Sequence, residues 1–326
     1  MADRCGTRGT AGSAAGLALR MLFGALLATS AVLAAATTVA AATPPAGYTL
    51  VDSGAISAGN GQTNGSVSCP ASTVPLDGGA DVSSTSLLVN LDSTYPTATG
   101  WDAVLNNVSR ASVFFDVWAV CSAAPSGYVQ QSISGTVVAN TASGFGPNCP
   151  SGLSPTGGGA LVDSTDTSVN VAGTYPTLFA PPGWETDFES HDSANVSAVS
   201  YVICGQYPAS SGWVAQMGAV TTDPADSQAD FSESCPAGLV VLGGGFQEEF
   251  GSAETLNSTY PGSDTEWTSA ENNSGAAGSV VPWAVCAGTS PNAGLPEAPG
   301  SWSLAVGGGA VLVMCSAVRR VRRRLG

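Results

Sequence analysis

The feature that most constrains the fold is a set of landmarks that recurs three times in the same order. Each copy opens on a glycine and an aromatic residue, and closes on "WAVC" at 118–121, "YVIC" at 201–204 or "WAVC" at 283–286. A Cys-Pro pair, a Gly-Gly pair, Thr-Tyr-Pro and a tryptophan lie between. Self-similarity at a regular spacing is the signature of a repeat architecture. We therefore divide this region into three β repeats, 47–127, 128–212 and 213–290.

Each repeat contains one early and one late cysteine, which predicts one disulfide per repeat. The expected pairs are Cys69–Cys121, Cys149–Cys204 and Cys235–Cys286. Sequence alone does not prove a connectivity, but this set is the most economical for three copies of one unit. Closing loops of this length stabilises a chain by about 4 kcal/mol on the chain-entropy argument. We interpret the cysteines as structural bonds, which leaves none for nucleophilic catalysis or zinc binding.

The local pattern within each repeat is that of short strands. Runs such as "YTLVDSGAIS" and "ASVFFDVWAVC" are rich in branched and aromatic residues and are bounded by Gly, Pro and Asn. The closing strand of the first repeat is apolar on both faces, so we expect Trp118 to contact a neighbouring sheet or repeat. Pro282 replaces Val117 in the third repeat, which predicts an edge strand or one that begins late.

These observations predict an all-β fold of three tandem, disulfide-stapled antiparallel β-sandwich or roll repeats. Because the linkers between the repeats are short, we expect the repeats to pack side by side with pseudo-threefold symmetry. The glycine pairs are expected to permit a β-bulge or a close backbone contact.

The two ends of the chain have the composition of targeting segments. Residues 1–42 combine arginines with an apolar run and a stretch of alanines, the pattern of a secretory signal peptide. At the other end a Pro/Gly spacer, 291–300, precedes an apolar run, 301–318, and an Arg-rich tail, 319–326. This order predicts a C-terminal transmembrane-type helix with residues 43–300 outside the cell. The expected location is the cell surface, with the protein anchored in the membrane or the wall.

Two resemblances support this location. The C-terminal order of motif, apolar run and basic tail resembles bacterial surface-sorting signals, although Ala298-Pro299 stand where a sortase signal has Thr-Gly. The landmarks over 47–286 resemble repeats common in exported proteins of high-GC Gram-positive bacteria. That group is largely uncharacterised, so the resemblance implies secretion and a β fold but no activity.

The region outside the cell is expected to be strongly acidic. Residues 43–300 hold 23 of the 24 acids and one basic residue, Arg110, which gives a net charge of −22. Phosphate neutralisation needs several Lys or Arg, so nucleic acid is excluded as a partner. The charge favours solubility and attracts cations. However, "DPADSQAD" at 223–230 lacks the spacing of a dedicated calcium loop. We therefore predict no metal site and no cofactor.

The sequence predicts no catalytic residue with any specificity. His191 is the only histidine, and it lies in a segment that the other repeats do not share. A hydrolase of the glycosidase type would need paired carboxylates. The available pairs are Asp187 with Glu189, and Glu248 with Glu249, and neither recurs in the other repeats. A secreted glycosidase-like hydrolase is the alternative function.

The recurring aromatics are the candidate ligand-binding residues. They are Tyr95 with Trp101, Tyr175 with Trp184, and Tyr260 with Trp267. Flat rings on a β scaffold can stack on sugar rings, and three copies would add avidity; the competing interpretation is that they are core or loop anchors. The main prediction is a non-enzymatic structural or adhesive protein of the cell surface that binds cell-wall or host glycans. Such a binding surface should occur in all three repeats, whereas an active site should occupy one.

Overall fold

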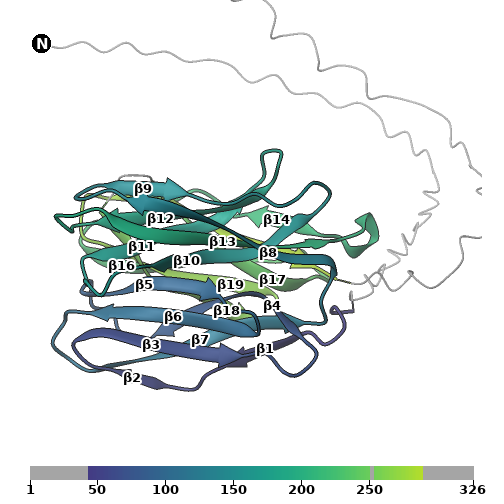
Figure 1. Cartoon of the computed structure of the whole chain (residues 1–326), viewed down its shortest axis with the longest axis horizontal. Coiled ribbons are helices and arrows are strands. Elements are labelled where there is room, and N and C mark those ends of the chain that lie inside the picture. Colours follow the sequence, from purple (N-terminus) through teal and green to yellow (C-terminus); the bar gives the residue numbers. More distant parts are fainter. Residues whose placement is uncertain (1–42, 250–252, 289–326) are drawn as a thin grey trace, which may run out of the picture. The chain divides into compact units, whose positions relative to one another are not determined.

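The computed structural model of the chain describes residues 43–249 and 253–288, which form twenty β-strands and one short 3₁₀ turn, η1 (Ala209–Ser211) (Figure 1). The all-β prediction is confirmed for these residues. No helix within the two ranges is long and apolar enough to cross a membrane. The predicted signal peptide (1–42) lies outside the described residues, as do the spacer, the anchor and the tail (291–326).

The three repeats contribute equivalent strands. The first contains β1 (Thr49–Asp52), β2 (Ile56–Ala58), β3 (Gly61–Ser68), β4 (Val74–Val82), β5 (Val89–Pro96), β6 (Gly100–Asn107) and β7 (Val113–Ser122). The second contains β8 (Ser126–Val137), β9 (Ala142–Phe145), β10 (Ser154–Val162), β11 (Val169–Thr177), β12 (Gly183–Ser190) and β13 (Val196–Gln206). The third contains β14 (Val214–Met217), β15 (Thr221–Asp223), β16 (Ser227–Ser234), β17 (Val240–Gln247), β18 (Glu254–Ser263), β19 (Glu266–Asn273) and β20 (Gly278–Ala287). The long β8 takes the place of β1 and β2.

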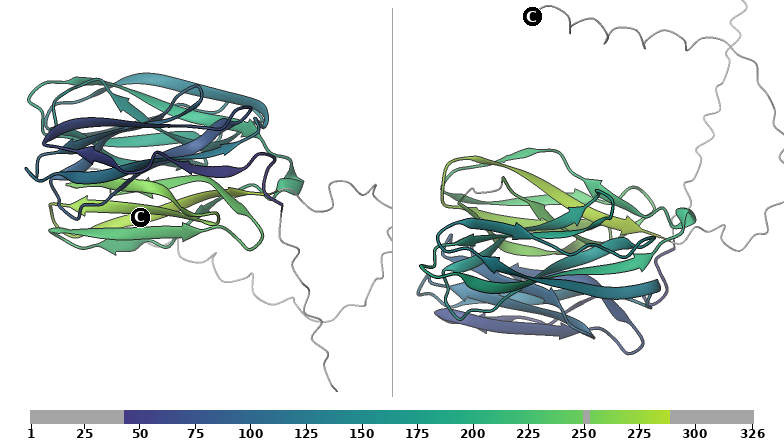
Figure 2. Two further views of the ribbon diagram at one scale, coloured as in Figure 1. Left: turned by 90° about the horizontal axis from the view of Figure 1, so that it is seen from below. Right: turned by 45° about the horizontal axis from the view of Figure 1, so that its top comes forward.

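The strands form three antiparallel sheets, and every sheet joins two repeats (Figures 1 and 2). The first-third sheet has the order β1-β7-β4-β18-β19-β16, with β2 also on β7. The first-second sheet has the order β3-β6-β5-β10-β13-β8. The second-third sheet has the order β14-β20-β17-β11-β12-β9, with β15 also on β20.

This topology agrees with the expected side-by-side packing of the three repeats, because each sheet contains strands of two repeats. It differs from three self-contained sandwiches, because each repeat divides its strands between two sheets, with three or four strands in each. The pairings therefore close a ring: the first repeat pairs with the second, the second with the third, and the third with the first.

Glycines make the joints between repeats possible. The joints are the antiparallel pairings Ala80↔Thr259, Ala160↔Thr94 and Phe246↔Thr174. The residue before each joint is a glycine, and a Cβ on it would collide with the carbonyl oxygen of the facing threonine; these glycines are Gly79, Gly159 and Gly245. The expectation that the glycine pairs permit close backbone contact is confirmed.

Three equivalent positions meet where the repeats converge: Asp77 in β4, Gly157 in β10 and Gly243 in β17. Any side chain at either glycine would overlap the carboxyl group of Asp77. That carboxyl group is fully buried. It accepts backbone N–H bonds from Gly78 at 2.9 Å, Gly158 at 3.3 Å and Gly244 at 2.8 Å. One carboxyl group thus satisfies donors from all three repeats.

The aromatic residue that opens each repeat bonds to the repeat before it. The Tyr48 hydroxyl donates to the carbonyl of Val241 at 2.9 Å, and the Tyr128 hydroxyl donates to Pro75 at 2.9 Å. The indole N–H of Trp213 donates to Pro155 at 3.3 Å. The three acceptors occupy equivalent positions. The hydrogen bonds therefore link the first repeat to the third, the second to the first and the third to the second, as the sheets do. The preceding glycines, Gly47, Gly127 and Gly212, all have positive φ, a conformation that favours glycine.

The disulfides have the predicted pairing, namely Cys69–Cys121, Cys149–Cys204 and Cys235–Cys286. The late cysteine of each pair lies in a closing strand, β7, β13 or β20, and is fully buried. Each disulfide therefore links the segment that follows β3, β9 or β16 to the closing strand of the same repeat.

The prediction for Pro282 is wrong. The strand β20 begins at Gly278, as its equivalents predict, and it lies between β17 and the pair β14 and β15. Pro282 has no N–H to donate, and it lies where neither short strand pairs with β20. The β14 pairing begins at Trp283, and the β15 pairing ends at Val280. The equivalent N–H in the first repeat, that of Val117, bonds to the Ser53 hydroxyl rather than to a strand.

Candidate functional site

The three repeat tryptophans are buried, so the prediction that they present their rings to a ligand is wrong. Their exposed fractions are 0% for Trp101 and 1% for Trp184 and Trp267. Each indole N–H donates to the threonine of the neighbouring Thr-Tyr-Pro: Thr94 at 2.7 Å, Thr174 at 2.7 Å and Thr259 at 2.8 Å. The competing interpretation, that they are core anchors, is confirmed.

The residue after Asp77, Gly157 and Gly243 is a glycine in every repeat, which explains why the tryptophans fit. A Cβ on Gly78, Gly158 or Gly244 would overlap the indole ring of its own repeat. The three consecutive positions therefore have different steric requirements. Gly157 and Gly243 leave room for the Asp77 carboxyl group, the next glycine of each repeat leaves room for the indole, and the third allows close contact with the neighbouring repeat.

The tyrosines of Thr-Tyr-Pro are half-buried and lie on the outer faces of the sheets, away from the core. Tyr95 stacks on Tyr201 with ring centroids 6.0 Å apart, and Tyr260 lies against Trp118 at 6.4 Å. In both pairs, one ring comes from Thr-Tyr-Pro and the other from the closing strand of a different repeat. The contact of Trp118 with a neighbouring repeat is as predicted.

In the second-third sheet, strand register places Tyr175 and Trp283 at the equivalent positions. Thr174, which precedes Tyr175, faces Phe246, and the adjacent Gly245 pairs with Trp283. These two positions are less open, because Trp283 is only 6% exposed. In all three sheets the closing-strand ring lies beside the last glycine of the run: Trp118 pairs with Gly79, Tyr201 with Gly159 and Trp283 with Gly245. The rings therefore also cover bare backbone.

The closing-strand aromatics were not predicted as site residues. Their signal was the aromatic-x-x-Cys motif that closes each repeat, from which only a packing contact was expected for Trp118. Recognising them requires knowledge that β4, β10 and β17 join repeats edge to edge, so that the two motifs meet on one face.

Polar groups surround the Tyr95–Tyr201 pair. The Tyr95 hydroxyl donates to Asp102 at 3.4 Å. Beside it is a hollow of about 540 Å³, lined by Gln62, Asn64, Asp92, Tyr95, Val104, Leu161, Val162, Asp163, Ser164 and Thr165. Burial raises the pKa of Asp92 to about 7, although hydrogen bonds from Ser93, Asn106 and Gln62 oppose the shift. An aromatic ring with amide and carboxyl groups around it is suited to a polyhydroxylated ligand.

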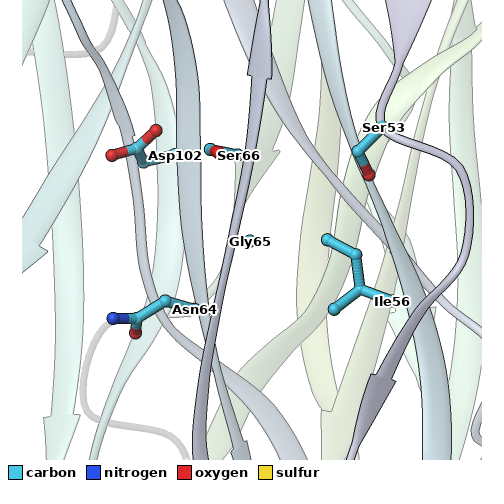
Figure 3. A pocket seen from close by; sticks show the side chains of 6 residues that line it. All are labelled: Ser53, Ile56, Asn64, Gly65, Ser66 and Asp102. Atoms are coloured by element: carbon cyan, nitrogen blue, oxygen red, sulfur yellow. The ribbon is translucent and has the colours of Figure 1, made fainter.

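A second hollow, of about 440 Å³, lies where β2 and β3 of the first repeat face each other. Its lining side chains do not converge: Asn64 and Asp102 point away from Ile56 (Figure 3). We therefore place the candidate binding face around Tyr95 and Tyr201, where Asn64 also lines the first hollow.

A separate group of acids lies in the third repeat and the adjoining strand β12. Asp187 and Glu189 share a face of β12, as predicted for an extended segment. Burial raises the pKa of Asp187 and of Glu248, and the charge of Asp187 raises the pKa of Glu248 further. Burial raises the pKa of Glu271 well above its usual range, and the charges of Glu254, Glu248 and Asp223 add to the effect.

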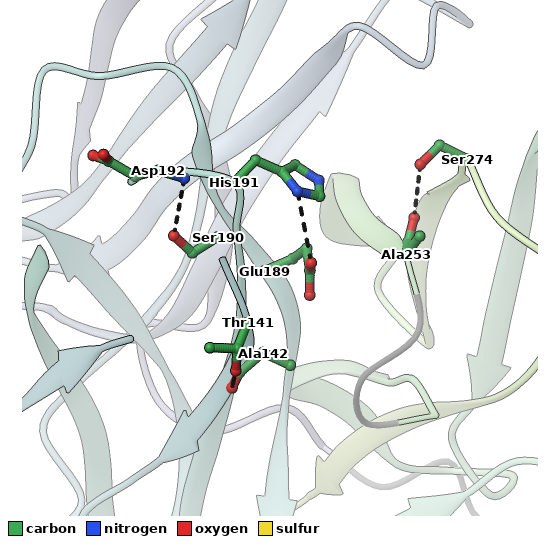
Figure 4. A network of polar contacts seen from close by, with 8 residues as sticks. All are labelled: Thr141, Ala142, Glu189, Ser190, His191, Asp192, Ala253 and Ser274. Atoms are coloured by element: carbon green, nitrogen blue, oxygen red, sulfur yellow. Dashed lines mark hydrogen bonds and ion pairs between the residues drawn. The ribbon is translucent and has the colours of Figure 1, made fainter. Parts of the chain in front are cut away.

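The predicted carboxylate pairs are not arranged as an open active site. Asp187 is 3% exposed and Glu248 is 6% exposed, so neither carboxyl group is open to a sugar ring. Glu249 is exposed, and therefore does not share the environment of Glu248. His191 is largely exposed, and its Nδ1 lies 3.9 Å from Glu189 (Figure 4).

No protein-family model matches the chain, and no curated protein matches it. The three disulfides indicate an extracellular or otherwise oxidising environment. In the described ranges, no three acid, histidine or cysteine side chains are already spaced as ligands of one metal ion.

Proposed function

We propose that the protein is a non-enzymatic, adhesive or structural component of the cell surface that binds glycans of the cell wall or of a host. The observation that carries this proposal is the recurrence of an outer-face aromatic pair on the sheets, open at Tyr95–Tyr201 and at Trp118–Tyr260. The pairs replace the buried tryptophans as the ligand-contacting rings.

The chemistry of the two open faces supports a sugar ligand. Aromatic rings offer a large apolar surface at low conformational cost, and adjacent carboxyl and amide groups can accept and donate hydrogen bonds to hydroxyls. The two open pairs lie on different sheets. One molecule would then engage two sites on a polymer or on two chains, so weak single contacts would combine into useful avidity.

The location is part of the same proposal. Disulfides fit an exported chain, and the sequence supplies a signal-like segment at 1–42 and an apolar run with a basic tail at 301–326. We propose that the C-terminus anchors the protein in the membrane or wall, with residues 43–300 outside.

The test is binding to a glycan array and to purified cell walls by the disulfide-bonded protein. Two double variants address the two faces: Tyr95→Ala with Tyr201→Ala, and Trp118→Ala with Tyr260→Ala. A matched control is Phe114→Ala, which removes a 52% exposed ring from the same face of β7 as Trp118. We expect each double variant to weaken binding at least tenfold, while the control binds normally. Unchanged binding by a protein carrying all four changes, with its melting temperature verified, would overturn the proposal.

The alternative is a glycosidase-like hydrolase, and the raised pKa of Asp187 and of Glu248 is the observation in its favour. It requires the two buried carboxyl groups to become accessible. Release of reducing sugar from cell walls, abolished by Asp187→Asn, would favour this function over adhesion.

A further inference from the structure

The third repeat replaces an apolar cluster by acids at structurally equivalent positions. The first repeat has Ala58, Val82, Val89, Leu105 and Val113, and the second has Val137, Val162, Val169, Phe188 and Val196. Both sets belong to the buried hydrophobic core. The third repeat has Asp223, Glu248, Glu254, Glu271 and Gly278 at these positions. The backbone therefore does not require acids here, since apolar side chains fill the same space twice.

The replacement is coordinated. A Cβ on Gly278 would collide with Oε1 of Glu254, so the loss of the valine found in the other repeats makes room for a carboxyl group. The surrounding frame is retained: the Asn273 side chain donates to the carbonyl of Asp223 at 3.5 Å. The equivalent Asn107 donates to the carbonyl of Ala58 at 3.3 Å. Only the side chains that occupy the space between these strands differ from those of the other two repeats.

Among the described residues, no cationic side chain balances the charges of Asp223, Glu248 and Glu271. Glu271 is 0% exposed, and within the described ranges neither of its carboxyl oxygens has a hydrogen-bond partner. The sequence between residues 43 and 300 has no lysine, and its only arginine, Arg110, is an exposed residue of the first repeat. Burying ionised carboxylates without a counter-charge is strongly unfavourable.

From this arrangement we infer that the third repeat carries a divalent-cation site, formed by Asp223, Glu248, Glu254 and Glu271. Carboxylate oxygens are the ligands that calcium prefers, and calcium tolerates irregular geometry with six to eight oxygens. In the described residues, the carboxyl groups are not already spaced as ligands of one ion. Binding therefore requires rotation of these side chains toward the ion. The cation would replace the apolar filling that stabilises the other two repeats, so the third repeat depends on calcium.

The experiment is thermal unfolding of the full disulfide-bonded chain, first in chelator at neutral pH and then with calcium chloride. Magnesium chloride and sodium chloride at matched ionic strength serve as controls for screening. The site predicts a saturable rise in melting temperature of about 5–10 °C at a calcium concentration 100-fold above Kd. Sodium chloride at the same ionic strength should not reproduce it.

Variants assign the response to the site. Glu271→Leu introduces the residue of the equivalent Leu105, and should raise the melting temperature in chelator while abolishing the calcium response. Glu271→Gln tests the same loss if the leucine variant folds poorly. Asp92→Asn, a change at a buried acid of the first repeat that accepts hydrogen bonds from Gln62 and Asn106, should keep the full response. Absence of a calcium response in the wild type, or an equal response in wild type and both Glu271 variants, would overturn the inference.

Discussion

The two ends of each repeat differ in how closely the three copies agree. At the end that contains the disulfide, all copies keep the glycine run, the tryptophan–threonine bond and the opening aromatic bond. At the opposite end two copies are filled by apolar side chains, whereas the third is filled by acids. The first end is constrained by backbone approach, where an added Cβ meets a carbonyl oxygen. The second is constrained only by side-chain volume.

This contrast indicates where such a fold can acquire function. Positions limited by backbone contact cannot change without opening the ring of sheets. Positions limited by packing can be refilled in one copy alone, because the neighbouring strands keep their register. The outer aromatic pairs should tolerate substitution to an intermediate degree, since each pair contacts two repeats and also covers a glycine.

The largest effect should come from the one asymmetric residue at the conserved end. Asp77→Ala would leave three buried N–H donors, one from each repeat, without an acceptor. At about 1–3 kcal/mol for each donor, we expect a loss of about 5 kcal/mol in the free energy of unfolding. Urea denaturation measures it. A loss below 1 kcal/mol would mean that the convergence of the repeats does not depend on this carboxyl group.

Truncating a repeat tryptophan tests the distinction between buried and outer rings. Trp184→Ala should cost about 4 kcal/mol, because it removes a fully packed indole and its bond to Thr174. Tyr95→Ala, in contrast, removes a half-buried ring and should cost less than half as much. Thermal denaturation of the two variants compares them. Equal costs would contradict the assignment of Tyr95 to the binding face.

The pH dependence distinguishes the buried acids from the exposed ones. Because the folded-state pKa of Asp92 is raised from 3.8 to about 7, its stabilising contribution is present below pH 3.8 and is lost as pH rises through 7. Integration over this shift gives a loss of about 2–3 kcal/mol between pH 5 and pH 8. Denaturation in chelator across this range measures the slope. Asp92→Asn should reduce the slope, and an unchanged slope would contradict the assignment.

The smallest effect concerns the opening aromatic bonds. Tyr48→Phe and Tyr128→Phe each remove one hydroxyl that donates across a repeat boundary. Tyr48→Phe should cost about 1 kcal/mol, and Tyr128→Phe should cost slightly more, because the Tyr128 hydroxyl also accepts a hydrogen bond from Gln130 at 3.0 Å. Chemical denaturation of both variants provides the values. A cost in one variant only would show that the ring of bonds is not symmetric in energy.

The sequence predicted the all-β fold and the disulfide pairs, because three copies of the same landmarks supply three independent readings of one unit. It did not predict that each sheet is shared by two repeats. Alternation shows which residues face inward, but not which edge pairs with which. The joint depends on a single facing pair such as Ala160↔Thr94, which leaves no separate signal in the sequence.

The candidate sites were harder to predict for specific reasons. An aromatic residue close to a hairpin turn can be either a core residue or a ligand-binding residue. Only the exposed fraction in the structure distinguishes Trp101 from Tyr95. The acids of the third repeat had a usable signal. When the repeats are aligned on their tryptophans, Glu271 corresponds to Leu105 and Phe188, which are core residues.

We expect the three repeats to form one cooperative unit that converges on Asp77. Native-state hydrogen exchange tests it most directly, with amides of the closing strands β7, β13 and β20 as reporters of the three repeats. We predict equal opening free energies in the three strands, and an equal decrease in all of them in Asp77→Ala, although Asp77 belongs to the first repeat. Exchange that falls only in β7, with β13 and β20 unchanged, would contradict the account and would show three repeats that unfold independently.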